Sequence, residues 1–339
     1  MNTRRSHSVR VLAGDIGGTK TRLAVVEVAG ARVHSVVEAT YRSAAHASLE
    51  AILTVFFSDH PASVQAACFG IAGPVRDGRA RTTNLPWRVQ ADALAKRFSI
   101  DRVFLLNDLE ANAWGIQALG PEDLHTLHEG DPDPEGNAAV IAAGTGLGEA
   151  GICRDRGGWH PFATEGGHAD FAPGSDLEIA LLRFLRARHG HVSWERVLSG
   201  PGLVAIHAFL REERAVPMPQ WLEEEMRIGD GAAAISRAAQ EGRDGLCAEA
   251  LGLFVRLYGA EAGNLALKHM ATGGLYLGGG IAPKILGALQ DDGFIQAFLD
   301  KGRMRPLLER VPVQVILNDR TALYGPAVYA ARRLEATRS

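Results

Sequence analysis

A glycine-rich turn near the start of the chain carries residue types that suit phosphate binding. It reads Asp15-Ile16-Gly17-Gly18-Thr19-Lys20-Thr21 and lies between strands predicted at Val9–Ile16 and Arg22–Val28. Gly17 and Gly18 can adopt positive φ and present backbone N–H groups to an anion, and Thr19 adds a hydroxyl donor. Asp15 is a candidate Mg²⁺ ligand, acting through water. A P-loop is excluded, because GxxxxGK[ST] is absent and a strand follows. The alternative is a hairpin turn with an Asp-capped bend.

A second turn of the same kind occurs in the middle of the chain. Gly144-Thr145-Gly146-Leu147-Gly148 separates strands predicted at Ala138–Ala142 and Glu149–Arg154. Three glycines in five residues let the backbone approach a phosphate closely. A single glycine hairpin is common, but the pair predicts a phosphate clamp contributed by two lobes.

The dipeptide Asn107-Asp108 follows a short buried strand predicted at Val103–Leu106. Ligands of α/β proteins bind at the carboxyl ends of strands. Asp108 is therefore a candidate general base that orients and deprotonates an attacking hydroxyl. The alternative is an N-cap for the helical pattern that continues to Leu119.

Two further segments offer carboxylates and an imidazole. Glu165-Gly166-Gly167-His168 has Glu-x-x-His spacing, and the second segment runs from Val192 to Gly202 and includes Glu195. A metal site at that spacing needs a helix to place both ligands on one face, whereas two central glycines indicate a loop. Carboxylates and an imidazole that converge on a polyol are the preferred interpretation, because sugar hydroxyls need partners in fixed directions. A surface loop without function is the alternative for either segment alone.

A glycine run near the C-terminal end of the chain leads from a strand into a predicted helix. Gly278-Gly279-Gly280 follows the strand predicted at Leu275–Leu277, and Pro283 lies near the first turn of the helix. These glycines would let a flat nucleoside lie against the backbone. A tight strand-to-helix turn is the alternative.

The two strand–glycine–strand units form a weak internal repeat, which predicts a duplicated α/β architecture of two lobes with a cleft between them. We expect a small lobe at 1–118, with a C-terminal helix at 320–339 packing back on it, and a large lobe at 119–319. The remaining elements are helices at Ala45–Phe57, Asp176–His189, Gly231–Glu241 and Leu246–His269, and strands at Val64–Ile71 and Val313–Leu317.

Composition narrows the class of protein. The chain has 339 residues, 46% hydrophobic and 22% charged, which is ordinary for a globular protein. Its net charge of -3 argues against a nucleic-acid partner. Cys68, Cys153 and Cys247 show no paired spacing, so free thiols in a reducing compartment are expected. The start of the chain shows no h-region, and no apolar run approaches the length of a membrane span. We expect a soluble cytoplasmic protein without a membrane partner.

The motifs together resemble the bacterial glucokinase family of the hexokinase/actin-like superfamily, which has a ribonuclease H-like fold. The matching segments span about residues 11 to 283 and follow one another as DIGGTKTRLAVVEV, GIAGPV, TTNLPW, LLNDLEANAWG, AAGTGLG, EGGHADFAP, VSWERVLSGPGL and GGLYLGGGIAP. EGGHADFAP and the ERVLSGPGL part of the seventh segment are the specific ones, since the glycine turns are shared across the superfamily.

The resemblance implies ATP-dependent phosphorylation of the 6-hydroxyl of glucose, a step of glycolysis, with Asp108 as catalytic base. It implies that the sugar contacts Asn84, Asn107, Asp108, Glu165, His168 and Glu195. It further implies that nucleotide, phosphates and Mg²⁺ lie against Asp15, Gly17, Gly18, Thr19, Gly144, Thr145, Gly146, Gly278, Gly279 and Gly280. A homodimer is a family expectation.

The sequence departs from related patterns in three places. Lys20 stands where such enzymes often have Asn, which alters the electrostatics of the phosphate turn. Ala169 to Glu178 contains no cysteine, so the zinc cluster of the repressor–kinase relatives is missing and no zinc is expected. Only eight residues precede the first strand, too few for the helix-turn-helix of those repressors. The alternatives are a kinase for another hexose or amino sugar, or a non-catalytic sugar-binding regulator on the same fold.

Overall fold

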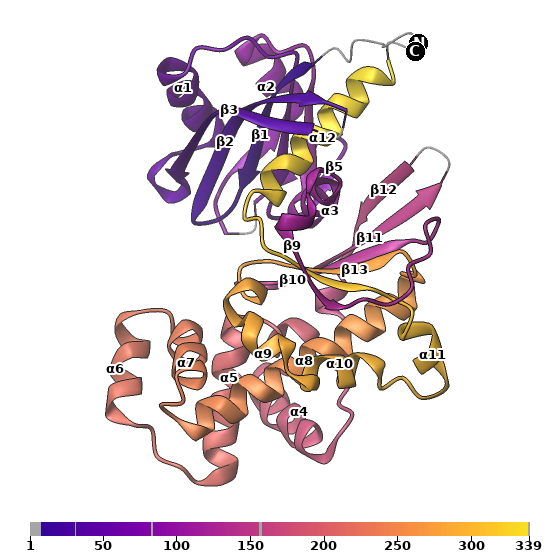
Figure 1. The fold of residues 1–339 in the computed structure, drawn as a ribbon. Coiled ribbons are helices and arrows are strands. Elements are labelled where there is room, and N and C mark those ends of the chain that lie inside the picture. The colour runs from indigo at the N-terminus through magenta and orange to yellow at the C-terminus, as the bar shows by residue number, and fades with distance from the viewer. Residues whose placement is uncertain (1–7, 31, 83, 156–157, 338–339) are drawn as a thin grey trace. The chain divides into compact units, whose positions relative to one another are not determined.

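The computed structural model describes residues 8–30, 32–82, 84–155 and 158–337, and Figure 1 shows the order of their helices and strands. The chain divides into two compact units. The first contains Met1–Asp123, His160–Ala163 and Asn318–Ser339, and the second contains Leu124–Trp159 and Thr164–Leu317. Residues 1–7, whose sequence shows no h-region, and the last two residues of the predicted C-terminal helix lie outside the described residues.

The first unit is built on a five-stranded sheet in the order β3-β2-β1-β4-β8. Its strands are β1 (Val9–Ile16), β2 (Lys20–Ala29), β3 (Arg32–Arg42), β4 (Ala66–Ile71) and β8 (Val103–Asn107). The first two strands form an antiparallel hairpin, while β1, β4 and β8 run parallel to one another. Every residue of β4 is buried, in agreement with its continuous apolar sequence, because a central parallel strand is covered on both faces.

Helices cover both faces of this sheet. Leu12 and Ile16 face α1 (Leu49–Asp59) and α2 (Ala91–Phe98). The alternate residues of β1 face α3 (Asp108–Gly115) and α12 (Thr321–Glu335), of which α12 is the yellow helix in Figure 1. The last two helices approach closely, because a Cβ at residue 325 would overlap the carbonyl group of Ala111. The remaining elements of this unit are a small sheet of β5 (Val75–Arg76), β6 (Arg79–Arg81) and β7 (Arg88–Gln90), and short 3-10 turns at Ser43–Ala45, Ile116–Ala118 and Pro121–Asp123.

The sheet of the second unit repeats this topology. Its order is β12-β11-β10-β13-β14-β9, formed by β9 (Leu124–His128), β10 (Ala138–Ala143), β11 (Leu147–Asp155), β12 (Gly158–Ala163), β13 (Gly274–Gly278) and β14 (Val313–Ile316). The edge strand β12 is shared, since its residues His160–Ala163 are grouped with the first unit. As in the first sheet, an antiparallel hairpin with a glycine turn is followed by two parallel strands. The internal repeat expected from the sequence is therefore present in the strand order, with β9 added antiparallel to β14.

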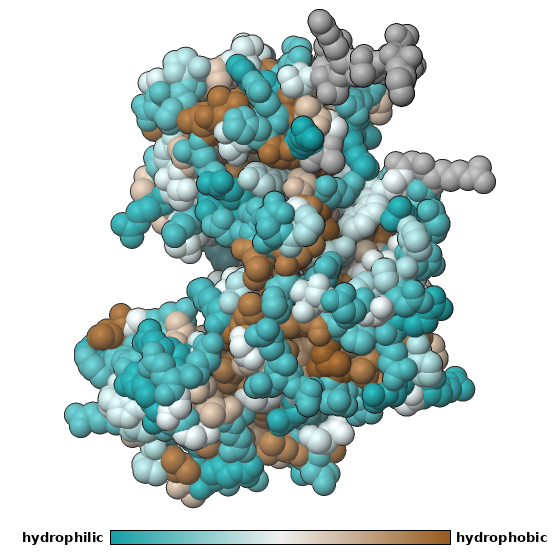
Figure 2. All heavy atoms as spheres, viewed as in Figure 1, coloured by the Kyte–Doolittle hydropathy of each residue, from teal (hydrophilic) through white to brown (hydrophobic). Residues whose placement is uncertain are grey.

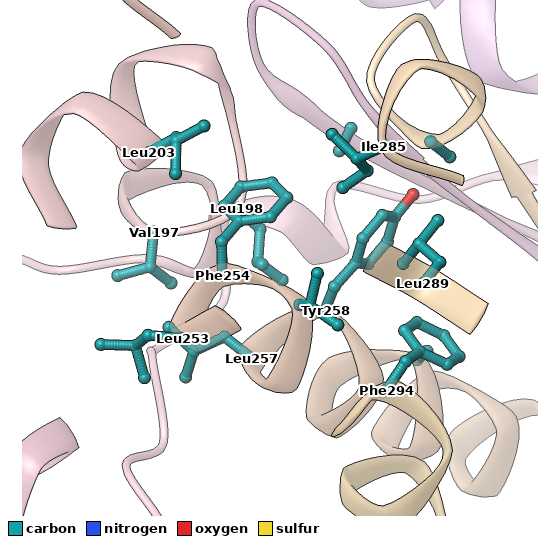
Figure 3. Close-up of a cluster of buried hydrophobic side chains, with 14 of the residues drawn as sticks. Val197, Leu198, Leu203, Leu253, Phe254, Leu257, Tyr258, Ile285, Leu289 and Phe294 are labelled. Atoms are coloured by element: carbon teal, nitrogen blue, oxygen red, sulfur yellow. The ribbon is translucent and has the colours of Figure 1, made fainter. Parts of the chain in front are cut away.

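Helix α8 (Gly245–His269) is central to the packing of the second unit. Fourteen of its 25 residues are buried, so it is a core helix rather than an amphipathic surface helix. Figure 3 shows its aromatic side chains among residues from several other elements, namely Val197, Leu198, Leu203, Ile285, Leu289 and Phe294. The other helices are α4 (Asp176–His189), α5 (Gly200–Arg214), α6 (Gln220–Ile228), α7 (Gly231–Gln240), α9 (Leu286–Gln290), α10 (Asp292–Leu299) and α11 (Arg305–Leu308), with 3-10 turns at Gly166–His168, Trp194–Arg196, Ala282–Ile285 and Gly302–Met304.

Hydrophilic residues cover most of the face drawn in Figure 2, with hydrophobic patches between them. Large apolar side chains such as Ile228 reach the surface at separate points of the sequence. No helix among the described residues combines the length and the hydrophobicity that a membrane span would require.

Candidate active site

The first glycine turn connects β1 to β2 and is supported by Ser43. The N–H of Gly17 donates to the carbonyl of Lys20 at 3.0 Å, and the hydroxyl of Ser43 donates to the carbonyl of Gly17 at 2.8 Å. The N–H of Ser43 in turn donates to the carbonyl of Thr19 at 3.0 Å. The buried residue Ser43 therefore fixes the conformation of the turn through two hydrogen bonds, and the sequence analysis did not single it out.

The role expected for the glycines in this turn needs correction. Neither Gly17 nor Gly18 has φ in the left-handed region. The need for glycine at position 18 is steric instead, because a Cβ there would lie 2.9 Å from the Cβ of Asn84. Asn84 therefore packs directly on the turn, and two parts of the predicted site meet within the first unit.

Asp15 lies at the carboxyl end of β1 and is partly buried. Burial raises the pKa of its carboxyl group to about 6, and the positive charge of Arg22 opposes that rise. A carboxyl group with this pKa is mostly ionised at neutral pH, and a nearby cation would favour the ionised form further. Oxygen is the ligand type that Mg²⁺ prefers, so the residue suits such an ion.

Asn107 and Asp108 lie at the same edge of the sheet as the first turn. Ile16 pairs with Ile71, and Ile71 pairs with Asn107, so the ends of β1, β4 and β8 form one row. The side-chain oxygen of Asn107 accepts hydrogen bonds from the N–H groups of Leu109 at 2.9 Å and Glu110 at 3.4 Å. Asn107 is therefore the N-cap of α3, and the alternative that Asp108 is the cap is wrong.

Asp108 is the first residue of α3 and is half-buried. One of its carboxylate oxygens accepts the N–H of Leu109 at 3.0 Å. An anionic side chain is favoured at the N-terminus of a helix, so a carboxylate suits this position.

The second glycine turn is tied to two neighbouring segments of the second unit. The N–H of Gly200, at the start of α5, donates to the carbonyl of Gly144 at 2.8 Å. The N–H of Leu147 donates to Oε2 of Glu195 at 3.0 Å. A Cβ at residue 146 would overlap that same carboxylate, so the turn and Glu195 fit together only with glycine there.

The glycine run at 278–280 lies beside this turn, since Ala142 pairs with Gly278 across β10 and β13. Gly279 has φ of 80°, the left-handed region that glycine tolerates. A Cβ at this position would also overlap the carbonyl oxygen of Ala143. Both observations fit the alternative of a tight strand-to-helix turn, and the expectation that a nucleoside lies against these glycines stays a prediction.

The loop from Glu165 to His168 lies on β11, and its side chains are exposed. The relative exposures of the Glu165 and His168 side chains are 69% and 62%, and their Oε2 and Nε2 atoms are 3.9 Å apart. The chain after the loop pairs with the segment before Glu195, because the N–H of Trp194 donates to the carbonyl of Ala169 at 3.0 Å. Three of the six residues predicted to contact sugar, Glu165, His168 and Glu195, thus come from two segments that are hydrogen-bonded to each other.

A cavity of about 610 Å³ lies against the second glycine turn, within the usual size range of small-molecule sites. Gly144, Thr145 and Gly280 line it together with the starts of α5 and α7, Ser236 and Lys284. The start of α5 belongs to the segment at Val192–Gly202 that the sequence analysis singled out, whereas the start of α7, Ser236 and Lys284 were assigned no role in the site. Asp230 caps α7 by accepting the N–H groups of Ala232 and Ala233. Lys284 gives the cavity a positive group for an anionic ligand, whereas the first N–H groups of α7 are already bonded to the Asp230 carboxylate. Asp230 before Gly231, an N-cap signal, is the sequence pattern that marks the start of α7.

Comparison with known families decides the class of this protein. A family model described as Glucokinase matches residues 12–333. The chain belongs to the glucokinase family. The glucokinase of Nostoc punctiforme is 44% identical over 337 residues, covering 95% of this chain and 99% of the relative. The glucokinase of Synechocystis is 45% identical over 349 residues, with coverage of 96% and 98%.

Solved structures of glucokinases have the same fold. A glucokinase from an Antarctic psychrotroph superimposes with a TM-score of 0.84 at 31% identity, covering 95% of this chain and 99% of that one. A ROK family glucokinase from Streptomyces griseus, solved in complex with glucose and AMPPNP, gives a TM-score of 0.65 at 25% identity, with coverage of 95% and 99%. The predicted α/β fold of the two-lobed hexokinase-like class is therefore confirmed, and this chain is an enzyme of the glucokinase family.

Within each unit, the structure brings the predicted residues of this glucokinase-family chain together. The first unit groups the turn at 15–19 with Asn84 at Gly18, and aligns its strand end with Asn107 and Asp108. The second unit groups the turn at 144–146 with Glu195 and the glycine run at 278–280. The loop at 165–168 joins that group through its pairing with the segment before Glu195.

Proposed function

We propose that this chain transfers the γ-phosphoryl group of ATP to the 6-hydroxyl of glucose and forms glucose 6-phosphate. The observation that carries the proposal is the division of roles at the start of α3. Asn107 is the N-cap of α3, and Asp108 is the first residue of the helix, where its carboxylate accepts the N–H of Leu109. Asp108 directly follows the end of β8, which lies in the same row of strand ends as the turn at 15–19.

Asp108 is the general base in this proposal. Its carboxylate accepts the proton of the 6-hydroxyl as the oxygen attacks the γ-phosphorus. Asn84, Asn107, Glu165, His168 and Glu195 hold the sugar hydroxyls. The exposure of the Glu165 and His168 side chains supports this role, because both offer polar atoms to a ligand. Positioning contributes most of the catalysis in phosphoryl transfer, so the precise placement of these groups matters more than covalent chemistry.

The nucleotide occupies the cavity of the second unit in this proposal. Thr145 with Gly144 and Gly146 binds the transferring phosphate, and Gly278 to Gly280 lie along the adenosine. In the first unit, Gly17, Gly18 and Thr19 bind phosphate oxygens, and Asp15 holds Mg²⁺ through water. When bound, Mg²⁺ neutralises charge on the phosphate oxygens. Zinc has no part in the proposal.

The remaining expectations belong to the same proposal. The small lobe at 1–118 and 320–339 and the large lobe at 119–319 each supply part of the machinery, and transfer requires both parts to act on one pair of substrates. We expect a cytoplasmic enzyme of glycolysis that works as a homodimer without nucleic acid. Light scattering on the purified protein measures the oligomeric state.

A coupled assay of the purified chain tests the function. Glucose, ATP and MgCl₂ should yield glucose 6-phosphate, and EDTA should abolish the reaction. Side-by-side kcat/KM values for glucose, mannose and N-acetylated amino sugars test the sugar. Absence of glucose 6-phosphate under these conditions contradicts the proposal. A higher kcat/KM for another sugar would show that this sugar, and not glucose, is the preferred substrate.

A further inference from the structure

Two carboxyl groups face each other inside the second unit. Glu149 on β11 is 1% exposed and Glu261 on α8 is 0% exposed. Glu261 has strong partners, since Nζ of Lys268 lies 3.1 Å from its Oε1 and the side-chain amide of Asn264 donates to its Oε2 at 2.7 Å. Oε1 of Glu149, by contrast, is buried without a donor among the described residues.

A proton on Glu149 would remove the repulsion between the two buried carboxylates. Ionisation of both buried carboxyl groups is energetically unfavourable, because neither is solvated and their charges repel each other. Once protonated, Glu149 is a donor and can offer a hydrogen bond to the carboxylate of Glu261, the neighbouring group whose charge raises its pKa. Burial is the largest cause that raises the pKa of Glu149, to about 8; the charge of Glu261 adds to the rise, and Lys268 opposes it. Glu149 is therefore mostly neutral at pH 7.

Glu149 lies directly beneath the loop that carries Glu165 and His168. A Cβ at residue 166 would overlap the Glu149 carboxyl group. The hydroxyl of Thr164 donates to the backbone carbonyl of Glu149 at 2.9 Å and accepts the N–H of Gly166 at 3.3 Å. Any movement of the Glu149 side chain towards the loop must therefore displace the backbone of the loop at Gly166.

We propose that Glu149 is a positioning residue for glucose binding, whose neutral side chain, bonded to Glu261, supports the loop at 165–168 in its binding geometry. This inference rests on the proposed function. Glu149 does not touch the sugar and acts through the loop above it.

Ionisation of Glu149 should disturb the loop, because a second negative charge would then face Glu261. The titratable groups that face the pair from α8 are Tyr258 and Lys268. Lys301 faces Glu261 from the segment after α10. Lys268 is half-exposed and already paired with Glu261, so it compensates only one of the two charges. Repulsion between the carboxylates would push Glu149 against Gly166.

The experiment compares the pH dependence of glucose binding in three proteins. In the unaltered enzyme, kcat/KM for glucose should fall above about pH 8, approaching about tenfold per pH unit, with the change mainly in KM. Glu149→Gln keeps the shape and a donor for Glu261 but cannot ionise, so this fall should disappear. Glu213→Gln, an exposed position on α5, is the matched control and should behave like the unaltered enzyme. A Glu149→Gln profile that superimposes on the unaltered one overturns the proposal.

Two further measurements keep the test decisive if Glu149→Gln folds poorly. Lys268→Met removes the cation that lowers the pKa of Glu149 and should move the midpoint of the fall to higher pH. An unchanged midpoint overturns the proposal. Infrared spectroscopy of the unaltered protein should show a protonated carboxyl band at pH 7 that is lost around pH 8, and its absence at pH 7 also overturns it. The infrared result does not depend on catalysis, so a protein that shows the band but leaves glucose unphosphorylated contradicts the proposed function instead.

Discussion

The side chain of Glu195 is hydrogen-bonded to the backbone of Leu147, with the N–H of Leu147 donating to Oε2 at 3.0 Å. The same oxygen occupies the space that a Cβ at residue 146 would need. One carboxylate thus contacts the glycine turn that we assign to phosphate, while we also assign it to the sugar. Removal of the Glu195 carboxylate should therefore weaken the binding of both glucose and ATP.

Substitution of Glu195 should separate these two roles. Glu195→Ala loses the acceptor for the Leu147 N–H and should raise KM for glucose by about 10- to 100-fold, the usual effect of losing a charge-assisted hydrogen bond. It should raise KM for ATP as well, by a smaller factor. Glu195→Gln retains a carbonyl acceptor and should raise KM for glucose alone. Steady-state kinetics with each substrate varied measures both constants, and Glu213→Ala is the control. An unchanged KM for ATP in Glu195→Ala would show that the turn does not depend on this carboxylate.

Asp108→Asn tests the general base. Asn retains an oxygen that can accept the N–H of Leu109 but cannot take a proton from the sugar. We expect kcat to fall by roughly 10²–10⁴, a typical range for a lost general base, with little change in KM for glucose. Asp101→Asn, an exposed carboxylate just before β8, is the control and should retain full activity. Turnover close to that of the unaltered enzyme would remove Asp108 from this role.

Gly279→Ala tests the glycine run beside the second turn. The left-handed φ of Gly279 and the overlap of a Cβ with the carbonyl of Ala143 both oppose alanine. We expect a loss of more than about 1 kcal/mol in the free energy of unfolding and a raised KM for ATP. Gly287→Ala on α9, where a Cβ has no neighbour within 4 Å, should not destabilise the protein. Urea unfolding and ATP kinetics measure the two effects, and equal stability of both variants would contradict the steric argument.

The central elements were predictable because their sequences leave few alternatives. The strand predicted at Val9–Ile16 and the helix predicted at Asp176–His189 have the observed bounds. The edge strand β3 was missed, since its residues alternate between exposed and half-buried and include several charges. The helix predicted at 45–57 begins instead at Leu49, because the hydroxyl of Ser48 accepts the N–H of Ala51 and caps it there.

The positions of the glycine turns and of Asp108 at strand ends were more predictable than the contacts that support them. Sequence patterns located both glycine turns and Asp108, because Gly and Asp directly after an apolar run mark the end of a strand in the local sequence. They could not show which of Asn107 and Asp108 caps α3, a choice that depends on side-chain rotation. The segment at Ser199–Gly202 was interpreted only as a source of polar groups, yet Ser199 caps α5 there. Long-range partners such as Ser43 beneath the first turn leave no local signal in the sequence.

The buried pair of carboxyl groups also predicts how stability depends on pH. Glu149 in the unfolded chain has an ordinary pKa near 4.5, whereas its pKa in the folded protein is raised to about 8, first by burial and then by Glu261. Between these values the folded protein holds a proton that the unfolded chain has released. By linkage, the contribution of Glu149 to the free energy of unfolding is therefore greatest below about pH 4.5, decreases as pH rises through this window and levels off above about pH 8.

Gln does not titrate, so Glu149→Gln should gain stability relative to the unaltered protein as pH rises from about 5 to 8. Urea unfolding at each pH measures the difference. The exposed variant Glu213→Gln should show a constant difference, and a constant difference for Glu149→Gln as well would show that Glu149 is ionised in the folded protein.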